Sequence, residues 1–72
     1  MPKKKYYTVK EVRQREGMTQ KEFAESIGVS AWSVGQYERG QMKPSAEVAQ
    51  RIYDLYGAIV PMAPTYVLVK KS

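Results

Sequence analysis

Apolar residues recur along the chain at the spacing of amphipathic helices, in runs separated by short polar segments. The longest run follows an i, i+1, i+4, i+7, i+8 pattern and comprises Val48, Ala49, Ile52, Leu55 and Tyr56. Shorter runs with the same period lie N-terminal to it. From these runs the sequence predicts helices at residues 9–16, 20–27, 31–38 and 46–56.

Start and stop signals support these helix positions. Thr8 with Glu11, and Thr19 with Glu22, have the spacing of a capping box, in which each side chain bonds the backbone amide of the other residue. A glycine follows each predicted helix, at positions 17, 28, 40 and 57. We expect these glycines to adopt the left-handed conformation that ends many helices.

The apolar faces of the predicted helices supply enough side chains for one small core. We predict that its members are Val9, Val12, Phe23, Ala24, Ile27, Val29, Val34, Tyr37, Val48, Ala49, Ile52, Leu55 and Tyr56.

Helix 31–38 carries the chain's single tryptophan. At about 100° per residue, Val34 and Tyr37 define its inward side. Trp32, Gln36 and Arg39 fall on the outward side, with Gly35 between Trp32 and Arg39. We therefore expect Trp32 to be exposed.

Two short segments near the ends of the chain are rich in β-branched or aromatic residues. Pro61 and Pro64 interrupt the path from the last helix, so we predict a separate strand at Tyr66–Lys70. A strand needs a partner, which either Lys4–Tyr7 or a second chain could supply. A solvated tail is the alternative interpretation.

Composition narrows the class of function. The 72 residues suffice for one small domain, which we place at 1–72, with a helical core at about 8–57 and a C-terminal extension at 58–72. Cysteine and histidine are both absent, which removes thiol nucleophiles, zinc-thiolate sites and the commonest general base. We therefore expect no enzyme activity, no bound metal and no cofactor.

Charge and hydropathy point to a cytoplasmic protein with an acidic partner. No apolar run approaches the length of a membrane span, and the lysine-rich N-terminus lacks the apolar stretch of a signal peptide. The formal net charge is +5 at pH 7. Nucleic acid is the usual partner of such a domain.

The middle of the chain carries the most specific signal, a short glycine-containing turn between helices 20–27 and 31–38. This arrangement is typical of a helix-turn-helix, whose second helix enters the major groove of DNA. The segment from about Val9 to Tyr56 resembles the repressor and Cro type of helix-turn-helix proteins, the XRE family. The matching residues are Thr19-Gln20, Phe23-Ala24, Ile27-Gly28-Val29-Ser30, Val34, Tyr37-Glu38, Gly40 and Pro44-Ser45.

The resemblance implies an all-α fold, a lambda-repressor-like bundle of four main helices, to which the ends of the chain could add a short β-element. By position it implies base contacts from the outward face of helix 31–38, at Ala31, Trp32 and Gln36. It implies phosphate contacts from the start of helix 20–27 and the loop after helix 31–38, at Gln20, Lys21, Arg39 and Lys43.

The expected base contacts differ in how well they suit the role. Gln36 can bond N6 and N7 of adenine together, and Ala31 can meet a thymine methyl. Trp32 departs from the usual polar residue, since it has one indole donor and a broad apolar surface.

Two functions follow from the same helix. The first is a sequence-specific regulator of transcription that binds double-stranded DNA, a small phage or prophage switch protein in the cytoplasm of a bacterial host. The second is an antirepressor or modulator that binds a partner repressor protein, because exposed tryptophan is typical of protein interfaces. Proteins of this type usually dimerise, so a homodimer is also expected.

Overall fold

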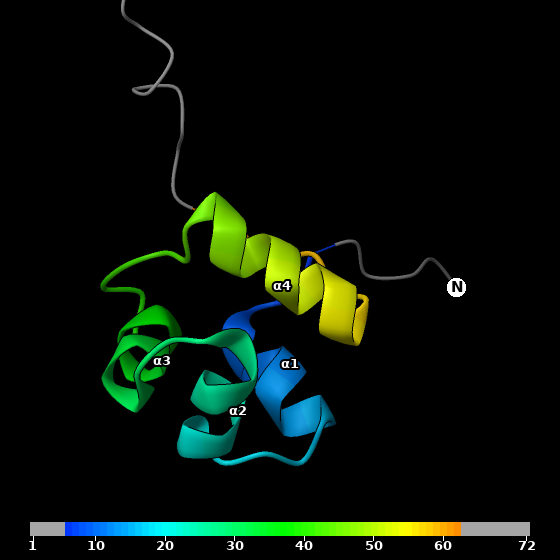
Figure 1. Ribbon diagram of the computed structural model, residues 1–72. Helices are drawn as coiled ribbons and strands as arrows, with labels where there is room; N and C mark the ends of the chain where they lie inside the picture. Colours follow the sequence, from blue (N-terminus) through cyan, green and yellow to red (C-terminus); the bar gives the residue numbers. More distant parts are fainter. Residues whose placement is uncertain (1–5, 63–72) are drawn as a thin grey trace, which may run out of the picture.

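Helices occupy all four predicted positions in the computed structural model, which describes residues 6–62 (Figure 1). Their bounds are α1 Val9–Arg15, α2 Gln20–Ile27, α3 Ala31–Glu38 and α4 Ala46–Tyr56. In Figure 1, α4 lies across the other three helices, with α3 toward one side and α1 toward the other. The predicted all-α bundle is therefore confirmed.

The helices begin and end at the predicted signals. Thr8 Oγ1 accepts from the Glu11 amide at 3.0 Å while the Glu11 carboxylate accepts from the Thr8 amide at 2.8 Å. Thr19 and Glu22 form the same reciprocal pair at 3.1 and 2.9 Å. The glycines at 17, 28, 40 and 57 all have positive φ, as predicted.

The buried apolar side chains come from every helix and from the segment after α4. They are Val9, Val12, Phe23, Ala24, Ile27, Val34, Val48, Ile52, Ala58 and Val60. Phe23 is fully buried and stacks on Tyr56 of α4, with ring centroids 5.4 Å apart. Val29, Tyr37, Ala49 and Tyr56 pack around the edge of this core and are partly buried.

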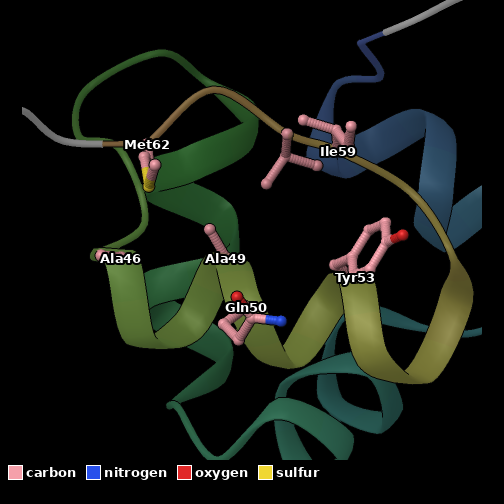
Figure 2. A pocket seen from close by; sticks show the side chains of 7 residues that line it. Ala46, Ala49, Gln50, Tyr53, Ile59 and Met62 are labelled. Atoms are coloured by element: carbon pink, nitrogen blue, oxygen red, sulfur yellow. The ribbon is translucent and has the colours of Figure 1, made fainter.

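Leu55 is a correction to the predicted core, because 56% of its surface is exposed. The buried stripe of α4 runs through Val48, Ile52 and Tyr56, and Leu55 lies at its outer edge. Ala58 and Val60 are buried instead, which carries the core past residue 57. The chain after α4 folds back along the Ala49 side of the helix and leaves an apolar groove of about 380 Å³ between them (Figure 2). The buried side of α4 therefore faces α2 and the returning chain, and Leu55 lies outside it.

The N-terminal segment pairs with this returning chain. Tyr6 and Ile59 form an isolated parallel β-bridge, and the Tyr7 amide donates to the Ile59 carbonyl at 2.8 Å. The expected β-element is therefore a single bridge in the part that the structure describes, and Tyr6 has Ile59 as its partner. The predicted strand Tyr66–Lys70 lies outside the described residues. No helix within residues 6–62 is long and apolar enough to span a membrane.

Ile52 and Leu55 provide a matched test of this packing within one helix. Ile52→Ala should cost about 2–5 kcal/mol of stability, since Ile52 is fully buried and the change leaves a cavity. Leu55→Ala should change the free energy of unfolding by less than about 1 kcal/mol, because its side chain is largely in water already. Urea unfolding of the two variants measures both values. Equal losses would show that Leu55 belongs to the core.

Candidate nucleic-acid interface

The turn between α2 and α3 is held by a left-handed glycine and by an arginine from α4. Gly28 has φ 75° and its amide donates to the Ala24 carbonyl, which ends α2. Arg51 Nη1 donates to the Ile27 carbonyl at 3.0 Å. The same nitrogen lies 2.9 Å from the place of a Cβ on residue 28, so a side chain there would displace the arginine. This turn sets the angle at which α3 leaves α2.

A second polar contact fixes α3 against α1 and α2. The carboxylate of Glu38, at the end of α3, accepts from Arg13 Nε at 2.5 Å and from Arg13 Nη2 at 3.1 Å. Its Oε1 also accepts from Gln20 Nε2 at 3.1 Å. Only 17% of the Arg13 side chain and 8% of the Glu38 side chain are exposed. One carboxylate therefore joins three helices at the edge of the core.

The pKa of Glu38 is the balance of opposing effects. Burial alone would raise this pKa, but the hydrogen bonds from Arg13 and Gln20 and the positive charges of Arg13 and Lys10 outweigh it. The net effect holds the pKa of Glu38 below its usual range. A carboxylate with a lowered pKa stabilises the folded protein above its unfolded-state pKa. That contribution is lost as the pH falls through the folded-state value.

With α3 held in this way, its free face is the one that the sequence predicts. Val34 is fully buried and Tyr37 is partly buried, whereas 65% of Trp32 is exposed. Ala31 is exposed beside it and Gln36 is half-buried one turn later. The exposure of Trp32 is therefore confirmed, and the three predicted base contacts lie on the outward side of one helix.

The four predicted phosphate contacts differ in their surroundings. Lys21, near the start of α2, and Lys43, in the loop after α3, are exposed. Gln20 uses its amide nitrogen on Glu38. Arg39 donates through Nη2 to Oε1 of Gln36 and thus lies on α3 itself. The two lysines are the predicted phosphate contacts that meet no protein partner within residues 6–62.

Gly35 has a role that the sequence did not reveal. It is buried, and the Arg39 guanidinium lies 3.5 Å from the place of its missing Cβ. The sequence placed Gly35 on the outward side without recognising that Arg39 covers it. The spacing of the two residues could have indicated this contact. Residues four apart are neighbours on a helix surface, and a glycine leaves room there for the arginine side chain.

The matched segment identifies the family. A model described as helix-turn-helix matches residues 9–59. The chain belongs to this family. The match covers all of α1 to α4 and supports the repressor and Cro type of helix-turn-helix, the type that binds DNA.

A similar segment occurs in a much larger protein. The chain is 37% identical over 62 residues to a type II methyltransferase, M.SsoII, of Shigella sonnei. The alignment spans 82% of this chain and only 15% of the methyltransferase. No solved structure matches the helix-turn-helix chain significantly. Within residues 6–62, His, Cys, Asp and Glu form no cluster that could hold a metal ion.

Glu38→Gln tests the contact that fixes α3. At neutral pH it should destabilise the protein by about 1–3 kcal/mol, because the partly buried Arg13 loses its charged acceptor. The difference from wild type should begin to shrink as the pH falls below about 4.3, the unperturbed value for Glu, and should be lost once the pH is below the lower pKa that Glu38 has in the folded protein. Thermal unfolding over a pH series measures this. Glu25→Gln, at an exposed carboxylate of α2, is the matched control and should change little at any pH. A loss for Glu38→Gln that stays constant down to pH 2 would contradict the assignment.

Trp32→Ala tests the exposed face. It should change the free energy of unfolding by no more than about 0.5 kcal/mol, as is usual for exposed positions. Wild-type indole emission should be that of a ring in water and should shift to the blue when the true partner is added. A blue-shifted spectrum in the free protein, with a large loss of stability on substitution, would place Trp32 in the core.

Proposed function

We propose that this helix-turn-helix domain is a sequence-specific regulator of transcription that inserts α3 into the major groove of double-stranded DNA. The observation that carries the proposal is the outward face of α3, where Trp32 is exposed and Ala31 lies next to it. The opposite side of α3 packs on the core through Val34. A major groove is wide enough to admit one helix presented in this way.

Charge supports nucleic acid as the partner. The chain has a formal net charge of +5, and Lys21 and Lys43 are exposed on the segments that flank α3. Lys21 lies in the first turn of α2, where the helix dipole also favours a phosphate. Contacts of this kind position a domain on DNA, and contacts to base edges then select the sequence.

The proposal extends to assembly and location. Two copies on half-sites roughly 34 Å apart would place one α3 in each of two successive major grooves. Such a homodimer would act in the cytoplasm of a bacterial host, as a small switch protein of the repressor and Cro type.

Trp32 favours one alternative function. A tryptophan exposed over 65% of its surface is an uncommon base contact, and tryptophan is enriched at the centres of protein interfaces. In this alternative, the same face of α3 binds a partner repressor protein and the domain acts as an antirepressor. The basic charge favours the DNA-binding function over this one.

The similarity to a methyltransferase does not extend the proposal to catalysis. The matched segment is 15% of that protein, and it is the segment in which this chain forms a helix-turn-helix. We propose that the chain, which contains no histidine or cysteine, is not an enzyme.

Lys21→Ala and Lys43→Ala test the DNA-binding function directly. Each variant should weaken binding to all sequences and make the slope of log K against log salt shallower by about one. Arg15→Gln is the control, because Arg15 Nη2 donates to the Tyr56 carbonyl at the end of α4, and that end lies on the side away from α3 (Figure 1). This variant should leave the slope unchanged. Fluorescence anisotropy with a labelled duplex, at several salt concentrations, gives the slopes.

A gel shift distinguishes the two functions. DNA from beside the protein's own gene is combined with the wild-type chain, with and without the neighbouring repressor protein. A shifted band with the chain alone supports DNA binding, and its loss in Trp32→Ala assigns the ring to the groove. No band with the chain alone, together with release of the repressor from DNA, would support the antirepressor.

A further inference from the structure

Arg39 differs from the other arginines of the domain in its partners. Arg13 pairs with Glu38, Arg15 with Glu16 and Arg51 with Glu47. Within residues 6–62, no carboxylate lies within ion-pair distance of Arg39, which is exposed. Its guanidinium instead donates to a neutral acceptor, Oε1 of Gln36. Within the described part of the chain, the positive charge of Arg39 therefore has no neutralising carboxylate.

The position of this guanidinium follows from local geometry. Arg39 is the C-cap residue of α3, and its amide donates to the Gly35 carbonyl at 3.1 Å. Side chains on a helix lean toward its N-terminus, so the arginine extends back over the preceding turn. Gly35 has no Cβ to occupy that place, and the guanidinium nitrogens lie 3.5 Å from where it would be. The charge thus lies at the level of Gln36, within the outward face and not beyond the helix end.

The contact also restricts what Gln36 can offer. Arg39 occupies a lone pair of Gln36 Oε1, so the free groups of the pair are chiefly the Gln36 amide hydrogens and the remaining guanidinium hydrogens. All of these are donors. Adenine, which presents a donor at N6 beside its acceptor at N7, matches this set poorly. Guanine presents two adjacent acceptors, N7 and O6, and arginine contacts them with two parallel hydrogen bonds.

We propose that Gln36 and Arg39 act as one unit that reads guanine in the major groove, with Arg39 as the specificity-determining residue. This inference rests on the proposed DNA-binding function. It changes the expected role of Arg39 from a phosphate contact to a base contact. It also changes the expected target of Gln36 from adenine to the guanine that Arg39 contacts.

Arg39→Lys is the decisive variant, because lysine keeps the charge but loses the planar pair of donors. Duplexes selected by the wild-type chain from a randomised library, at one salt concentration, should contain an invariant guanine in each half-site. Arg39→Lys should reduce the preference for that guanine by about 5- to 150-fold while retaining binding to DNA in general. Arg15→Lys, the same substitution on α1, is the control and should select the wild-type sequence.

A modified base checks the contact at the level of one atom. Replacing the selected guanine by 7-deazaguanine removes the N7 acceptor and leaves O6 in place. The wild-type chain should lose affinity for this duplex, whereas Arg39→Ala, which has no side-chain donor at this position, should bind the modified and natural duplexes nearly equally. Gln36→Ala should weaken the guanine preference to a smaller extent, because it removes the group that orients the guanidinium.

The possible failures are distinct. If the wild-type chain binds a selected sequence but Arg39→Ala retains the full preference for every base, the guanine assignment is wrong and the proposed function stands. Equal loss of affinity for all sequences in Arg39→Ala would likewise overturn it and make Arg39 a phosphate contact. If the wild-type chain selects no sequence at any salt concentration, both the inference and the proposed function fail.

Discussion

The Glu38 carboxylate is the contact on which the geometry of the interface depends. Apolar burial drives the helices together but is not directional, so it alone does not set how α3 is rotated. Hydrogen bonds do have direction. Because Glu38 receives them from Arg13 of α1 and Gln20 of α2, α3 is held at its C-terminal end by two other helices. Arg51 fixes the other end of α3 through the turn at Gly28.

Holding α3 at both ends explains how the helix can present an apolar ring to solvent. Trp32 lies between the two fixed ends and is needed by neither of them. Ser30 caps the helix by accepting from the Ser33 amide, and Val34 anchors its inward side. The fold therefore does not depend on what residue 32 contacts. That independence leaves the position available for a binding partner.

The features predicted from the sequence are those that depend on residues close together in the chain. The capping boxes at Thr8 and Thr19 span three residues, and the inward side of α3 follows from Val34 and Tyr37 within one helix. The wrong assignment of Leu55 has a non-local cause, since it depends on a returning chain that covers the other side of α4. The contact between Arg13 and Glu38 joins positions 25 residues apart, and nothing in either local sequence indicates it.

In the candidate site, too, local features could be predicted from the sequence and non-local contacts could not. That Trp32 is exposed follows from helical phase, but the partners of Gln20 and Arg39 do not. Both are polar residues near helix ends, and both were expected to meet phosphates. They differ in the acceptor that each one contacts in the folded protein. Gln20 donates to a partly buried carboxylate and helps to hold α3. Arg39 donates to a neutral amide and has no carboxylate partner among residues 6–62. The polar groups that fix the helix are therefore separate from those that remain available to a partner.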